Sequence, residues 1–225
     1  MNWTRSAAIA CAMTLGGAAM AQQAATPAPP PAPDFSKVEI KTTDLGNKVY
    51  MLEGQSGNIT VAVGKNAIIM VDGEFAPLHD KIRAAIATIS NLPIKYLVNT
   101  HYHGDHTGGN APFAKDGAIV IANIKVKTRL AKGTTNGLTG AKVPPAAPEA
   151  LPKLTYTRQL RLTVRGRSAL LRHVEHAHTD GDTYVWFKSS NVLATGDTFT
   201  NGRYPNIDFA QGGNITGMIA ATNAY

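Results

Sequence analysis

From residue 34 onward, the chain begins with short apolar runs that alternate with turn residues. Val, Ile, Tyr and Thr dominate the runs, and segments rich in Gly, Asn and Asp separate them at 44–46, 54–57 and 64–66. Such spacing is typical of strands joined by tight turns. We therefore expect an antiparallel sheet built from segments 37–41, 48–53, 58–63 and 67–71.

The apolar pattern then changes its period. Ile82, Ala85, Ile86 and Ile89 follow the spacing of an amphipathic helix, which Pro77 opens and Pro93 closes. Further along we expect strands at 94–99, 118–124, 154–163, 170–174, 183–187 and 191–195, helices at 126–132 and 214–223, and a long loop at 133–152. Strands interleaved with helices predict the α/β class, as an αββα sandwich with helices outside two packed sheets.

The first 34 residues have a different composition. One positive charge precedes an apolar stretch at 6–21, which ends in the small-x-small pattern Ala19-Met20-Ala21. This order is typical of a cleaved export signal, and the apolar stretch is too short for a membrane span. We expect a signal peptide at 1–21, a Pro/Ala-rich linker at 22–34, one folded domain at 35–225, and a periplasmic or secreted protein with no integral membrane segment after cleavage.

Cysteine and charge narrow the possible partners. The only cysteine, Cys11, would leave with the signal, so any metal must bind nitrogen and oxygen. The formal net charge is +7, but the basic residues are scattered. We interpret the one cluster, Lys125, Lys127, Arg129 and Lys132, as a solvated helix face. A small-molecule substrate is therefore expected, and no nucleic-acid partner.

Five of the seven histidines fall in two short segments, each directly after an apolar run. His101, His103, Asp105 and His106 offer four nitrogen and oxygen ligands within six residues. Neutral imidazole and carboxylate without cysteine match the ligands of zinc in hydrolytic sites. The alternative is a polar surface loop that carries histidines by chance, and the density of ligands disfavours it.

Four segments, in this order, resemble the metallo-β-lactamase superfamily. Thr100-His101-Tyr102-His103-Gly104-Asp105-His106-Thr107-Gly108-Gly109 resembles its signature loop, preceded by Val71-Asp72-Gly73 and followed by His178-Thr179-Asp180-Gly181-Asp182 and Thr195-Gly196-Asp197-Thr198. The resemblance runs from about residue 48 to 208 and implies the same αββα sandwich.

The resemblance also implies roles for individual residues. His101, His103 and His178 would bind one zinc ion, Asp105 and His106 a second, and Asp197 both. A hydroxide between the metals would be the nucleophile. Asp105 would also act catalytically, by orienting that hydroxide or passing a proton, and Asp72 would support the metal loop from behind.

Other histidines and acids receive structural interpretations. His176 lies two residues before His178, but the resemblance selects His178. We place His173 and His176 on a strand or at the rim, and His79 on the exposed side of the first helix. Asp180 and Asp182 either orient histidines or shape the turn, and the turn is favoured.

The sequence departs from the family pattern at one point. The second zinc normally has a further histidine after the bridging aspartate, and this sequence has no histidine after His178. We therefore expect a chain truncated at its C-terminus, without the last strand and helix of the sandwich. Two zinc sites are expected, the second without its last histidine.

These observations favour an exported zinc-dependent hydrolase that cleaves an ester, thioester or lactam bond. A periplasmic metallo-β-lactamase is the named alternative, and a zinc-binding protein without catalysis is the alternative from another class. An iron oxidoreductase would differ in its metal content. The segment 133–152 and Arg203 are candidates for substrate contact.

Overall fold

The structure is a computed structural model that describes residues 34–137 and 140–225, and Asp34–Tyr225 form one compact unit. The expected signal peptide and the linker up to residue 33 lie outside the described residues. Within the described part of the chain, no helix has both the length and the apolar character that crossing a membrane requires.

The larger sheet has seven strands in the order β1-β2-β3-β4-β5-β6-β9. Its strands are β1 (Lys41–Asp44), β2 (Val49–Glu53), β3 (Ile59–Val63), β4 (Ile68–Val71), β5 (Ile94–Val98), β6 (Ile119–Asn123) and β9 (Leu154–Tyr156). β1 to β4 pair antiparallel, as their turn spacing predicts, whereas β4, β5, β6 and β9 pair parallel. Parallel strands need covered faces, and β3 and β4 are buried at every position.

The smaller sheet is an antiparallel meander with the order β10-β11-β12-β13. Its strands are β10 (Gln159–Val164), β11 (Arg167–His173), β12 (Thr183–Phe187) and β13 (Val192–Ala194). A two-stranded hairpin, β7 (Thr134–Thr135) with β8 (Lys142–Val143), lies in the segment predicted as a long loop.

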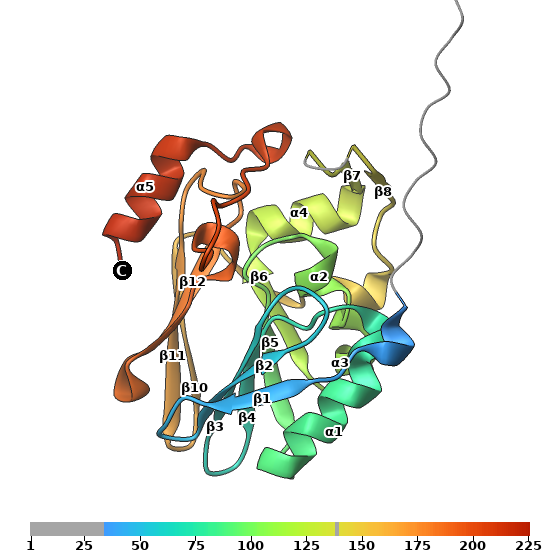
Figure 1. Ribbon diagram of the computed structural model, residues 1–225, viewed down its shortest axis with the longest axis vertical. Helices are drawn as coiled ribbons and strands as arrows, with labels where there is room; N and C mark the ends of the chain where they lie inside the picture. Colours follow the sequence, from blue (N-terminus) through green and yellow to red (C-terminus); the bar gives the residue numbers. More distant parts are fainter. Residues whose placement is uncertain (1–33, 138–139) are drawn as a thin grey trace, which may run out of the picture. The chain divides into compact units, whose positions relative to one another are not determined.

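Helices cover both sheets (Figure 1). They are α1 (His79–Ile89), α2 (Gly104–Thr107), α3 (Asn110–Lys115), α4 (Ile124–Lys132) and α5 (Ile215–Asn223), with short 3-10 turns η1 (Phe35–Lys37), η2 (Ala76–Leu78), η3 (Pro148–Ala150), η4 (Lys188–Ser190), η5 (Gly196–Thr198) and η6 (Phe209–Gln211). α1 begins after Pro77 and ends at Ser90, close to its predicted limits.

Three apolar layers hold the sandwich together. Between the sheets, side chains such as Val98 and Ile121 pack against Leu171 and Phe187. The outer face of the larger sheet packs against α1 and α3, and α5 packs through Met218 against the outer face of the smaller sheet. The order helix, sheet, sheet, helix confirms the predicted αββα class.

Three element predictions need correction. The first strand occupies Lys41–Asp44 and not 37–41, because Asp34 caps a 3-10 turn there through its side chain. The run 154–163 is two strands in different sheets, β9 and β10. Segment 104–115, for which no helix was predicted, forms α2 and α3.

The topology brings the carboxyl ends of β4, β5 and β6 to one edge of the larger sheet. Loops at such an edge are held by rigid strands and are free to carry function. The segments that carry Asp72 and His101 to His106 begin there.

Candidate metal centre

Each candidate ligand directly follows a strand or lies in a connection between strands. His101 and His103 follow β5, and His106 lies in α2. His178 lies in the connection from β11 to β12, and Asp197 follows β13 in η5. The site therefore draws on both sheets.

Three ring nitrogens converge at the first cluster. His103 Nδ1 lies 3.0 Å from His101 Nε2 and 2.9 Å from His178 Nε2. All three side chains are buried, with exposures of 1%, 7% and 0% for His101, His103 and His178. The three rings thus point one nitrogen each at a common centre.

The outward nitrogens decide where the protons sit. His178 Nδ1 lies 2.8 Å from the carbonyl oxygen of Asn206, and His103 Nε2 lies 3.0 Å from the carboxylate of Asp208. Both partners accept only, so both outward nitrogens carry hydrogen. His101 Nδ1 faces the hydroxyl oxygen of Thr100 at 3.1 Å.

That hydroxyl donates its own hydrogen to Asp72 Oδ2 at 2.7 Å and so accepts from His101. All three inward nitrogens therefore present bare lone pairs to one another. Lone pairs at this separation repel, and a cation at their centre would turn the repulsion into coordination.

A second cluster shares His101 with the first. It consists of His101, His106 and Asp197. His106 Nδ1 donates to Asp72 Oδ2 at 2.8 Å, so Nε2 is the nitrogen that faces the cluster. That Nε2 is buried without a hydrogen-bond partner among the described residues and faces Asp197 Oδ1 at 3.2 Å.

The electrostatics of the protein alone match these two clusters. Burial, with the neighbouring histidine charges, lowers the pKa of His101 well below its usual value, and burial also lowers the pKa of His103. Burial would lower the pKa of His106 too, but the carboxylates of Asp72 and Asp197 outweigh it and raise that pKa. A proton on His106 thus takes the place that a cation would take.

The charge on Asp197 is also maintained. Burial would raise its pKa, but His106 and the charges of His178 and His103 outweigh burial and lower it. Gly196 lets this carboxylate approach: its backbone is left-handed at φ 54°, and a Cβ there would lie 2.6 Å from Thr100 Oγ1.

Asp72 lies behind both clusters, at the position that the family resemblance implies for it. Its Oδ1 accepts from the backbone N–H of Thr100 at 2.7 Å, and its Oδ2 accepts from Thr100 Oγ1 and His106 Nδ1. The side chain is 2% exposed. One carboxylate therefore orients His106 directly and His101 through a hydroxyl.

Asp105 belongs to neither converging group of described residues. Its Oδ2 accepts from Ser56 Oγ at 2.7 Å and lies 3.6 Å from His106 Nε2. The Ser56 backbone N–H in turn donates to the buried Glu74, whose pKa burial raises. Asp105 therefore borders the second cluster, tethered to the β2–β3 connection.

The remaining histidines lie outside both clusters. His176 is exposed and binds the carbonyl oxygen of Gly212. His173 ends β11 and donates to the carbonyl oxygen of Asp182. His79, expected to be exposed, is half-buried between Asp80 and Asp116 and packs edge-on against Phe113.

The acids after His178 shape the turn. Asp182 accepts from the backbone N–H and the hydroxyl of Thr179. Asp180 pairs with Arg129 at 2.7 Å, and the Arg129 guanidinium lies 5.8 Å from the ring centroid of Tyr102. The expectation that the basic cluster of α4 is a solvated face is therefore wrong at Arg129.

Asp208 is a site residue that the sequence did not reveal. It is fully buried and accepts from His103 Nε2 and from Tyr102 Oη at 2.6 Å. Burial would raise its pKa, but these hydrogen bonds outweigh it and lower the pKa. No local pattern marks a carboxylate that lies so far along the chain from its histidine.

The residues present fit zinc. Neutral imidazole nitrogens with one shared carboxylate and no thiolate are a zinc-type donor set, and the unpartnered Nε2 of His106 is a polar atom that a cation would satisfy. His101, His103 and His178 would hold one ion. His106, Asp197 and His101 lie where a second would sit.

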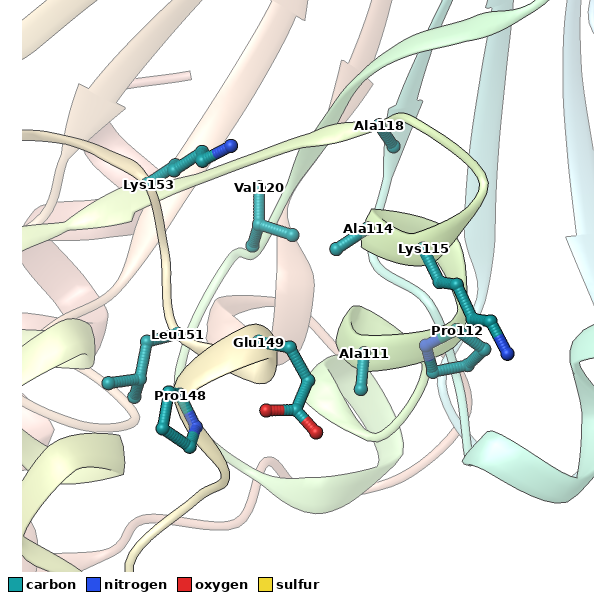
Figure 2. Close-up of a pocket in the computed structure, with 10 residues that line it drawn as sticks. All are labelled: Ala111, Pro112, Ala114, Lys115, Ala118, Val120, Pro148, Glu149, Leu151 and Lys153. Atoms are coloured by element: carbon teal, nitrogen blue, oxygen red, sulfur yellow. The ribbon is translucent and has the colours of Figure 1, made fainter.

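A cavity of about 630 Å³ opens beside the second cluster. Met51, Ser56, His106, Asp197, Phe199 and Arg203 are among the residues that line it. A separate cavity of about 530 Å³ lies between α3 and η3, and none of the clustered residues lines it (Figure 2). The first cavity thus gives access to His106 and Asp197 of the second cluster.

Comparison with known proteins agrees with this architecture. Solved structures that share the fold include a subclass B3 metallo-β-lactamase of Bradyrhizobium japonicum, with 23% identity, a TM-score of 0.56, and coverage of 68% of this chain and 58% of that one. A metallo-β-lactamase from Pontibacter korlensis gives 15% identity, a TM-score of 0.68, and coverage of 83% and 84%.

A curated relative is the 2,4-dinitroanisole O-demethylase subunit alpha of a Nocardioides species, 25% identical over 180 residues. The match covers 79% of this chain but 52% of that protein, so the chain spans about half the length of this relative. The family model described as the metallo-β-lactamase superfamily matches residues 52–223. With both the fold and this match, the chain belongs to the metallo-β-lactamase superfamily.

Proposed function

We propose that the protein is a zinc-dependent hydrolase that cleaves an ester, thioester or lactam bond. One observation carries the proposal: the bare nitrogens of His101, His103 and His178 meet at one point, each with its proton fixed on the far side of the ring. Structural histidines rarely face one another in this way, because the arrangement is repulsive without a cation.

The chain's own residues would divide the work of hydrolysis. When bound, zinc supplies Lewis-acid polarisation of a carbonyl and an acidified water at neutral pH. The neutral imidazoles would hold the ion, and Asp197 lies between the clusters, where its negative charge would offset repulsion between two cations.

Protons and atoms balance simply in such a reaction. The oxygen of water joins the acyl carbon, the bond to the leaving group breaks, and the leaving group takes up the proton that water loses. Asp105, beside His106 at the edge of the second cluster, is placed to carry that proton. Ser56, which donates to Asp105, restricts the orientation of the carboxylate.

The cavity beside the clusters supports an amphipathic substrate. Met51 and Phe199 give it apolar surface, and Arg203, which forms no ion pair with a described residue, adds a positive charge. An acyl compound with an apolar group and an anionic group would complement this lining.

A hydrolysis screen tests the proposal. Zinc-loaded protein would be assayed with β-lactams, lactones and thioesters, and with a nitroanisole, since one relative is named as an O-demethylase. Turnover that disappears in His103→Ala and Asp197→Ala supports hydrolysis. Stoichiometric zinc with no turnover on any class would favour the non-catalytic zinc-binding alternative.

A β-lactamase is the second candidate within the same chemistry. The solved structures that share the fold include subclass B3 and other metallo-β-lactamases. Their sequence identity to this chain is low, so the likeness concerns the fold alone. Faster turnover of β-lactams than of simple lactones and thioesters would select this candidate.

Export and metal number are part of the same proposal. We infer a periplasmic or secreted protein from the pattern of residues 1–21, with a linker before a single domain from residue 35. Cell fractionation with N-terminal sequencing of the mature protein tests both. Metal analysis distinguishes one zinc ion per chain from two.

A further inference from the structure

The cavity between α3 and η3 is separate from the histidine clusters, because none of the clustered residues lines it. It measures about 530 Å³, within the range of small-molecule sites. We propose that it binds a small carboxylic acid with an apolar body, of the size of a medium-chain fatty acid.

The surface of the cavity is mostly apolar. Ala111 and Ala114 come from α3, Val120 comes from β6, and Leu151 and Pro148 come from the segment around η3 (Figure 2). Each apolar atom that a ligand removes from water here contributes to binding. An alkyl or aryl group therefore fits this space better than a sugar or a nucleotide.

The charged side chains at the cavity determine the head group. Lys115, Lys153 and Glu149 line it, and none of the three forms an ion pair or a side-chain hydrogen bond with another described residue. Figure 2 shows them spaced around the apolar side chains. Two unpaired cations against one anion favour a ligand with a single negative charge.

Hydrogen bonds fix the walls, so the cavity is formed before any ligand arrives. Ala118 N–H donates to the carbonyl oxygen of Phe113 at 3.0 Å, which ties α3 to β6. Lys153 N–H donates to the carbonyl oxygen of Val120 at 2.9 Å, which ties the opposite wall to the same strand. A preformed site loses little conformational entropy on binding.

A buried amide joins the two walls to the metal loop. Asn110 Nδ2 donates to the carbonyl oxygen of Ala150 at 3.0 Å, and Asn110 exchanges hydrogen bonds of 2.8 and 2.9 Å with Asn99. Asn99 Nδ2 also donates to the carbonyl oxygen of His106. The cavity thus backs onto the metal loop and does not open into it.

The experiment is a titration of the full zinc-loaded chain, carrying ¹³C-labelled Ala, Val and Leu methyl groups, with octanoate and with octylamine. The expected result is saturable shifts of Ala111, Ala114, Val120 and Leu151 with octanoate and weaker binding of octylamine. Lys115→Gln and Lys153→Gln should each lower the affinity for octanoate about tenfold, and Glu149→Gln should raise that affinity about two- to threefold. Lys127→Gln, on a helix that does not line the cavity, is the matched control.

A second variant keeps the test independent of charge. Ala114→Phe fills the cavity from a half-buried position of α3 and should abolish the octanoate shifts, and the unchanged methyl spectrum outside the cavity shows that the variant is folded. The proposal is overturned if octanoate shifts no cavity methyl group, if octylamine binds as tightly, or if the lysine variants bind as the control does.

Discussion

Asp208 accepts a hydrogen bond of 3.0 Å from His103 Nε2 across 105 positions of the chain. The same oxygen accepts from Tyr102, whose pKa burial and this carboxylate raise, so that the phenol remains a donor. Because a carboxylate only accepts, His103 must keep its proton on Nε2 and its lone pair on Nδ1. Asp208 is therefore a positioning residue for a metal-type histidine.

Replacing Asp208 should weaken zinc binding without removing a ligand. In Asp208→Ala, His103 loses the partner that fixes its tautomer, and we expect zinc affinity to fall about 10- to 100-fold. Competition with a chelating dye measures the affinity. Asp116→Ala, which removes a carboxylate paired with His79 and Arg83, is the control and should keep wild-type affinity. Equal affinity in the two variants would contradict the role of Asp208.

Replacing Asp72 separates charge from shape. Asp72 has a left-handed backbone at φ 61°, which asparagine tolerates, so Asp72→Asn keeps the turn but loses the carboxylate that receives three hydrogen bonds. We expect the free energy of unfolding of the metal-free protein to fall by about 2–4 kcal/mol. Urea denaturation measures it. A loss under about 0.5 kcal/mol, the level of a surface change, would show that the network is dispensable.

Two neighbouring histidines allow a matched test of the ligand choice. His178 is fully buried at the first cluster, whereas His176 is exposed and bonded to Gly212. His178→Ala should release zinc from the first site, and His176→Ala should retain it. Metal analysis after gel filtration measures both. Loss of zinc in His176→Ala with retention in His178→Ala would reverse the assignment.

Removing the metal should cost stability in proportion to its binding. A ligand that binds only the folded protein at about 1,000 times its Kd adds about 4 kcal/mol, so a chelator should lower the Tm and added zinc should restore it. Magnesium, which prefers six oxygen ligands, should not substitute. Scanning calorimetry checks this, and His101→Ala, which lacks the nitrogen common to both clusters, should respond much less to zinc. A Tm indifferent to chelator and zinc would argue against a structural contribution of the metal.

Several residues named from the sequence come together in the structure, although some of the elements around them were predicted wrongly. The family resemblance of four short motifs selected His101, His103, His106, His178 and Asp197, and the structure brings them together. The motifs could be recognised because each comes soon after an apolar run that the sequence shows as a strand. The role of Asp72 could also be predicted from the sequence, since a carboxylate that ends a buried strand needs polar partners.

Contacts between segments far apart in the chain could not be predicted from the sequence. Nothing near Asp208 signals that Tyr102 and His103 will donate to it, and nothing near Arg129 signals its pairing with Asp180. The division of run 154–163 between two sheets was missed for the same reason. Apolar alternation predicts a strand but not the sheet that the strand joins.

At Gly217, helix propensity and tertiary packing predict opposite effects of a substitution. It lies inside α5, where replacing glycine by alanine should add about 1 kcal/mol from helix propensity alone. In the structure, however, a Cβ at this position would overlap the carbonyl oxygen of His176, and the same loop carries His178. We therefore expect Gly217→Ala to destabilise the protein by about 1–3 kcal/mol, through the strain of overpacking, and to weaken zinc binding as α5 is pushed from the loop.

Ala220→Gly, on the exposed face of α5, is the control: it should cost about 1 kcal/mol and leave zinc affinity unchanged. Chemical denaturation with zinc titration distinguishes the two accounts, since a Gly217→Ala variant more stable than wild type would mean that α5 does not press against the loop.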